Sequence, residues 1–250
     1  ERNIFSILLG MQLYAEFEFH QEPSNEHLAK RFKTCTGCEM ADFMELTYLD
    51  NAKGAPILKP EFPTNTSRYA MWQDLLCGLM DYHIKGQGME AQYMALTEFF
   101  EKAKTRNGKF NFIFAYYQLL ASALSIKAEI GIKIKSAYDG GDKALLKNMI
   151  QITLPELKER IEALRKFQRE LWFQINKPFG YEVLDLRYGA LLTRIDTAIW
   201  RIEKYLEGSI DTIEELNETR LSFDGTEGLT ENIVYHKIFS SSKISFLTTL

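Results

Sequence analysis

The feature that most constrains the fold is a long helical pattern of apolar residues in the segment 184–206. These residues recur every third or fourth position, which places them on one face of an α-helix. Gly208 ends the pattern. A helix with so long an apolar face must pack against other helices, so we expect a helical bundle. The positions are Leu184, Tyr188, Leu191, Ile195, Ile199, Ile202 and Leu206.

Two further segments have the same spacing and supply the other long helices. The first is 110–138, which Gly140 and Gly141 should end. Polar residues such as Lys127 interrupt its apolar face, which favours a buried core helix over a membrane span. The second runs from Asp142, a suitable N-cap, toward Asn176.

Two prolines bear on the ends of these helices. Pro155 predicts a kink or break near Thr153, where Thr153 and Glu156 match a capping box. Pro178, in the Lys-Pro-Phe-Gly sequence 177–180, suits the first position of the third helix.

The rest of the chain predicts shorter elements, and the overall prediction is a mainly α fold. It consists of a bundle of three long helices with shorter N-terminal helices and a short β tail. The shorter helices are expected at 26–33, 40–47, 68–82, 90–104 and 213–217, a proline-rich connector at 50–67, and strands at 233–239 and 243–246.

Charge and cysteine content narrow the functional classes. Lysine plus arginine number 30 against 34 acidic residues, a formal charge of −4, so a nucleic-acid partner is not expected. Three cysteines do not make a disulfide framework, and a reducing cytoplasm is the simpler setting. The lone Cys35-x-x-Cys38 lacks a second ligand pair, and Glu16 and His20 lie one turn apart without a third partner. We therefore expect no metal and no cofactor.

The densest mixture of aromatic and charged residues surrounds the break at 177–180. Such residues could border a sugar or a second subunit, or simply pack and cap a helix junction, which is the more common role of large apolar side chains at a helix crossing. A neighbouring set could serve helix packing or dimerisation, because Gly189 and Ala190 would let another helix approach closely. The first set is Trp172, Lys177, Phe179, Tyr181, Glu182, Asp185 and Arg187, and the second is Leu184, Tyr188, Gly189, Ala190, Leu191 and Ile195.

Three segments of the sequence resemble parts of bacterial family 20 glycoside hydrolases, the exo-acting β-N-acetylhexosaminidases. Segment 171–206, LWFQINKPFGYEVLDLRYGALLTRIDTAIWRIEKYL, is similar to their C-terminal helical region, and FDGTEGLTENIVYH at 223–236 continues the similarity. IFSILLGMQLYAEFEFH at 4–20 resembles the last helix of their (β/α)8 barrel. The resemblance implies four parts: 1–22 as a remnant of that barrel helix, 23–66 as short helices and connector, 67–222 as the helical domain, and 223–250 as a tail.

The resemblance also implies what the chain lacks. The chemistry of that family needs an Asp-Glu pair that works with the acetamido group of the substrate, and no Asp in this chain is directly followed by Glu. We therefore interpret the chain as a non-catalytic helical domain that supports a catalytic barrel and forms a homodimer. Glycans ending in N-acetylhexosamine would be substrates of the full enzyme. The start at Glu1 without a signal peptide is interpreted as a cut, and no membrane partner is expected.

Two other classes remain open from the residues alone. One is a free-standing helical protein-interaction module, and the other is a helical enzyme of unrecognised type built around 177–187. The native sequence before Glu1 would distinguish them.

Overall fold

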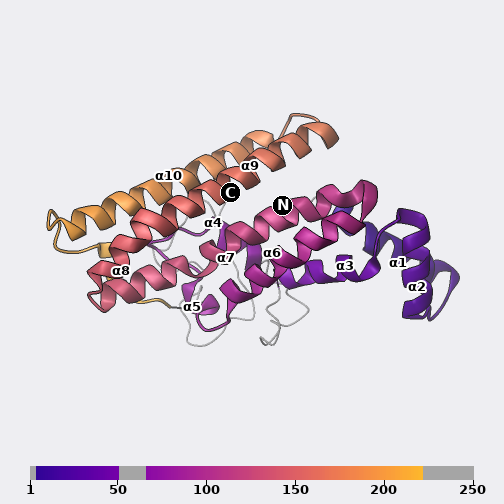
Figure 1. The fold of residues 1–250 in the computed structure, drawn as a ribbon, viewed down its shortest axis with the longest axis horizontal. Coiled ribbons are helices and arrows are strands. Elements are labelled where there is room, and N and C mark those ends of the chain that lie inside the picture. Colours follow the sequence, from indigo (N-terminus) through magenta and orange to yellow (C-terminus); the bar gives the residue numbers. More distant parts are fainter. Residues whose placement is uncertain (1–3, 51–65, 222–250) are drawn as a thin grey trace.

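The computed structural model describes residues 4–50 and 66–221, and these residues form helices joined by turns, with no strand among them (Figure 1). The predicted mainly α fold is confirmed. The connector at 51–65 and the tail at 222–250, with its two expected strands, lie outside the described residues. In chain order the elements are η1 (Ile4–Ile7), α1 (Leu8–Phe19), α2 (Asn25–Thr36), α3 (Met40–Met44), η2 (Glu45–Leu49), α4 (Thr66–Trp72), α5 (Asp81–Ile84), α6 (Met89–Arg106), η3 (Gly108–Phe110), α7 (Asn111–Asp139), α8 (Lys143–Asn148), η4 (Met149–Thr153), α9 (Leu154–Ile175), α10 (Tyr181–Leu206) and α11 (Glu214–Asn217).

Three long helices, α7, α9 and α10, form the bundle that the apolar spacing predicts. Short turns reverse the chain between them, so consecutive helices are antiparallel, and α9 and α10 run side by side along one edge of the molecule (Figure 1). The 18-residue helix α6 packs along α7 on the other side. Helices α1 and α2 lie at one end of the molecule (Figure 1).

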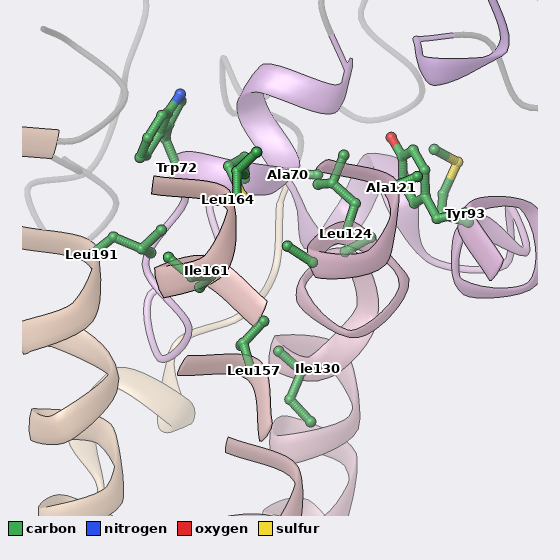
Figure 2. Packing of buried hydrophobic residues seen from close by; sticks show 14 of the residues in the cluster. Ala70, Trp72, Tyr93, Ala121, Leu124, Ile130, Leu157, Ile161, Leu164 and Leu191 are labelled. Carbon is green, nitrogen blue, oxygen red and sulfur yellow. The ribbon is translucent and has the colours of Figure 1, made fainter. Parts of the chain in front are cut away.

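The core fills the space between these helices. Figure 2 shows Leu157 of α9 beside Ile130 of α7, Ile161 of α9 on the side of Leu191 of α10, and Leu124 on α7. All five residues are buried. Each such side chain contributes about 1.5–3 kcal/mol when it leaves water, so this apolar layer is what holds the bundle together.

The chain passes from α8 to α9 without a break, but the helix is irregular at Thr153, near which the sequence predicts a kink or a break. Asp142 caps α8 as expected, since its carboxylate accepts a hydrogen bond from Leu145 N at 2.9 Å. The five residues Met149–Thr153 form a π-helical turn immediately before Pro155. A wider turn accommodates the proline ring and its missing N–H, so the helix need not end. Thr153 has helical backbone angles and makes no capping hydrogen bond, so the expected capping box is absent.

The helix predicted at 68–82 is wrong in its second half. Helix α4 ends at Trp72, and the chain continues as a buried irregular segment, 73–80. The Asp74 carboxylate accepts from the backbone N–H groups of Leu76 and Cys77, and Gln73 Oε1 accepts from Met80 N at 2.9 Å. Short polar side chains that bond to nearby backbone groups compete with helix formation.

Two glycines allow this irregular segment to lie close to the bundle. Gly78 has a φ of 56°, in the left-handed region that favours glycine. Gly131 of α7 faces the segment so closely that a Cβ there would lie 2.9 Å from Leu75 O. The segment therefore packs directly on the backbone of α7.

The turn before α10 differs from the prediction at Pro178. The helix begins at Tyr181, so Pro178 lies in the preceding turn, and Gly180, with a φ of 93°, is the N-cap. The end of α10 at Leu206, followed by Glu207 and Gly208, agrees with the predicted stop. Within 4–50 and 66–221, no helix has both the length and the apolar character that a membrane span requires.

Candidate functional site

The junction between α9 and α10 is a closed turn built by local contacts. Trp172 Nε1 donates to Lys177 O at 2.9 Å, and the Trp172 ring lies 5.8 Å from that of Tyr181. Glu182 accepts from Gly180 N at 2.7 Å. Trp172 and Glu182 therefore hold the turn, the packing and capping role that the sequence also allowed.

The other predicted junction residues divide between surface and interior. Lys177, Phe179 and Asp185 are exposed, and none of them lines any of the three cavities described below. Arg187 is buried, and its guanidinium lies 5.9 Å from the centre of the Trp72 ring on α4. Its side chain therefore lies on the inner face of α10, apart from the exposed junction residues.

The predicted packing set also divides between two faces of α10. Leu184, Tyr188, Leu191 and Ile195 are buried in the core of their own chain, so they pack α10 against the bundle. Tyr188 also donates to Gln168 Oε1 at 2.5 Å and packs edge-on against Trp72 at 5.0 Å. Gly189, in contrast, is exposed, with no heavy atom within 4 Å of where its Cβ would be, and Ala190 is half-buried.

A fully buried lysine on α7 anchors the irregular segment. Lys127 Nζ donates to Ala70 O at 3.1 Å and to Gln73 O at 2.7 Å. Burial lowers the pKa of Lys127 from 10.5 to about 8, against the opposing charges of Asp74 and Asp81. Carbonyl groups at the C-terminal end of a helix have no hydrogen-bond partner within the helix, and Lys127 provides donors for them at the end of α4.

Two buried carboxylates next to this lysine form ion pairs with distant arginines. Asp74 Oδ2 lies 2.6 Å from Arg194 Nε, and Asp81 Oδ2 lies 3.0 Å from Arg220 Nε. Burial raises the pKa of Asp74, but the hydrogen bond and charge of Arg194 outweigh it, so that the pKa is lowered overall. These pairs fasten the irregular segment to α10 and to the chain after α11. The sequence analysis missed them because their partners are far away along the chain.

Three of the cavities formed by the described residues differ in character. The smallest, about 40 Å³, lies between α4, α7 and α10 beside Trp72 and Tyr188, and has room for water rather than for a sugar. An open cavity of about 610 Å³ lies between α5, α7 and 217–220, and includes the paired charges Asp81–Arg220 and Lys135–Asp139. A third of about 560 Å³ lies beside Phe112 and Phe167.

A cluster of potential metal ligands joins α1 to α2. Glu16 is buried, and its Oε2 lies 2.8 Å from His27 Nε2, while its Oε1 accepts from Arg31 Nε at 3.0 Å. Ligand atoms of Glu16, His20 and His27 all lie within 4.8 Å of one another. The hydrogen bond from His27, followed by that from Arg31, lowers the pKa of Glu16. The sequence analysis noted the pair Glu16 and His20 but missed His27, which α2 contributes.

The two cysteines of the Cys-x-x-Cys sequence lie in different surroundings. Cys35 is exposed on α2, whereas Cys38 is buried and its Sγ donates to Asn107 O at 3.5 Å. Burial raises the pKa of the Cys38 thiol. Cys38 therefore behaves as a core residue.

The described residues thus form an all-helical domain in which the buried carboxylates Asp74 and Asp81 are paired with arginines. The family model described as Glycoside Hydrolase 20C C-terminal domain matches residues 41–235, and the chain belongs to that family. No curated protein matches the chain. The resemblance of 171–206 and 223–236 to the C-terminal helical region is thereby confirmed. Helices α1 and α2 precede the matched residues, so the resemblance of 4–20 to a barrel helix stays a prediction.

Proposed function

We propose that this chain is the non-catalytic helical domain of a family 20 exo-β-N-acetylhexosaminidase and that it supports the catalytic barrel through α1. The observation that carries the proposal is an apolar stripe on the outer face of η1 and α1. Ile7, Met11 and Tyr14 follow one another at steps of four and three, and Met11 and Tyr14 are 59% and 75% exposed.

The opposite face of α1 is already used. Leu9 and Glu16 are buried, and Glu16 bonds to α2, so the stripe points away from the helical domain. Monomeric proteins rarely leave contiguous apolar surface uncovered. Segment 4–20 resembles the last barrel helix, and such a helix buries its apolar face on the barrel strands. We therefore propose that the catalytic barrel covers this stripe. The substrates of the full enzyme would then be glycans ending in N-acetylhexosamine.

The test uses the polypeptide that carries both the barrel and this domain. Tyr14→Glu would place a charge in the proposed contact. The melting temperature of the enzyme, followed by loss of its catalytic activity, should therefore fall. Met94→Glu is the matched control, because Met94 is 54% exposed on α6, away from the stripe. Equal melting temperatures for the two variants would refute the contact. An ordinary start codon directly before Glu1 in the native gene would favour the free-standing module instead.

A second apolar stripe supports the proposal that the domain forms a homodimer. Val183, Leu186 and Trp200 are exposed on the outer face of α10, and Leu186 is 58% exposed. Ala190 lies between them at helical spacing, and small residues permit close approach of a second helix. Because closed twofold pairing is the commonest way to cover such a face, we propose that α10 pairs with α10 of a second copy. The exposed Phe179 could then border the sugar site of the neighbouring subunit.

Light scattering measures this association directly. The chain should have the mass of a dimer at micromolar concentrations, and Leu186→Glu should convert it to a monomer. Leu145→Glu, at an exposed position of α8, should leave the dimer intact. A monomeric wild-type chain would refute pairing through α10. A cytoplasmic location is also proposed, in keeping with the free thiols of Cys35 and Cys38.

A further inference from the structure

We propose that Glu16, His20 and His27 form a binding site for a divalent transition-metal ion of the zinc type, which would clamp α1 to α2. One carboxylate and two imidazoles are a ligand set that Zn²⁺ and Co²⁺ accept, with water in the fourth position. The three ligand atoms already lie within 4.8 Å of one another. This proposal does not depend on the role of the domain in a glycosidase.

The backbone fixes where the two histidines stand. His20 is the C-cap of α1, and its N–H donates to Glu16 O at 2.9 Å. His27 lies in the first turn of α2, and its N–H donates to Ser24 Oγ at 3.2 Å. Both ends of the connection between the helices are thus held by hydrogen bonds, which limits the entropy that the ligands would lose on binding an ion.

The two oxygens of Glu16 have separate partners. Oε1 accepts from Arg31 Nε at 3.0 Å and from Gln12 Nε2 at 2.7 Å, so this oxygen is held by outer partners that orient the carboxylate. Oε2 faces His27 Nε2 at 2.8 Å. An ion would enter on the Oε2 side, away from the positive charge of Arg31.

Between Glu16 and His27 only a small movement is needed to admit the ion. Two ligands of a tetrahedral zinc lie about 3.3 Å apart, given metal–ligand distances near 2.0–2.1 Å. The contact between Glu16 and His27 is 2.8 Å, so the side chains must separate by roughly half an ångström. The His20 and His27 rings meet edge to face at 4.9 Å, and neither ring is fully buried, so both can rotate. An ion replaces the direct contact between Glu16 and His27.

The competing interpretation is an ordinary ion pair, in which Glu16 holds His27 and Arg31 without a metal. Equilibrium dialysis of the 250-residue chain against Zn²⁺, with Co²⁺ absorption as a second readout, separates the two. We expect one Zn²⁺ per chain and a rise in melting temperature when zinc is added. His20→Ala removes a ligand but keeps the contacts of Glu16 with His27 and Arg31, and it should weaken binding at least about tenfold.

Two control variants make the result specific. His83→Ala removes a histidine on α5, and Cys35→Ser removes the exposed thiol, and both should bind zinc as the wild type does. Circular dichroism establishes that each variant is folded. Absence of stoichiometric zinc from the wild type, zinc binding unchanged in His20→Ala, or binding lost in Cys35→Ser would each overturn the proposal.

Discussion

The buried Lys127 predicts an unusual dependence of stability on alkaline pH. Burial lowers the pKa of Lys127 from 10.5 to about 8 in the folded chain, so folding disfavours its protonated form. Between these two pH values the unfolded chain binds more protons than the folded chain does. The contribution of Lys127 to stability therefore rises with pH through this window, and below pH 8 the cost of burying its charge is fully present.

The magnitude follows from the size of the shift. One pKa unit corresponds to about 1.4 kcal/mol, so between pH 7 and pH 10 the contribution of Lys127 to the free energy of unfolding should rise by about 2–3 kcal/mol. Other groups also titrate in this range, but they titrate in both the wild type and a Lys127 variant, so their effects cancel in the difference between the two proteins. The difference between the wild type and Lys127→Met isolates the lysine, because Met keeps the apolar stem and removes the titrating amine.

The assay is urea unfolding of both proteins at pH 7, 8, 9 and 10, followed by circular dichroism. The free-energy difference between wild type and Lys127→Met should shift by about 2–3 kcal/mol in favour of the wild type as pH rises. Lys133→Met is the matched control, because Lys133 is exposed on the same helix and forms an ion pair with Glu90. A difference that stays constant with pH for Lys127→Met would refute the reasoning.

Three further predictions concern local structure and activity. Asp142→Ala removes the N-cap of α8 and should lower the free energy of unfolding by about 1 kcal/mol in urea titrations; an unchanged value would show that the cap adds nothing. Gly131→Ala puts a Cβ 2.9 Å from Leu75 O and should destabilise the chain by about 1–3 kcal/mol. Gly189→Ala, where the Cβ meets nothing within 4 Å, should instead be neutral or stabilise by up to about 1 kcal/mol, and equal effects at both glycines would contradict the packing described. The isolated chain should release no chromophore from an aryl N-acetylglucosaminide, and turnover that copurifies with it would contradict a non-catalytic role.

The sequence alone determined the long helices and most of their ends. Apolar residues at steps of three and four set α7, α9 and α10, because that spacing is a property of the helix itself. Asp142 and Gly208 act on backbone groups within a few residues of themselves, so the sequence was sufficient to place these ends. The segments 171–206 and 223–236 that resemble family 20 enzymes were also readable without coordinates, and the family match at 41–235 agrees with them.

The same helical spacing did not decide which side chains would meet. Arg187 was grouped with its neighbours along the sequence, yet it packs inward against Trp72. Segment 73–80 had the composition of a helix, but Asp74 and Gln73 bond to its backbone, and Gly131 gives it space against α7.

Only the tertiary structure decided the polar contacts between distant parts of the chain. Lys127 donates a hydrogen bond to a carbonyl group just after α4, and Asp74 forms an ion pair with Arg194. Glu16 of α1 contacts His27 of α2. Helical periodicity records which face of a helix is apolar, but it contains nothing about the partner that the opposite helix presents. Because a buried charge is stable only beside a suitable partner, the location of these groups was fixed when the helices packed.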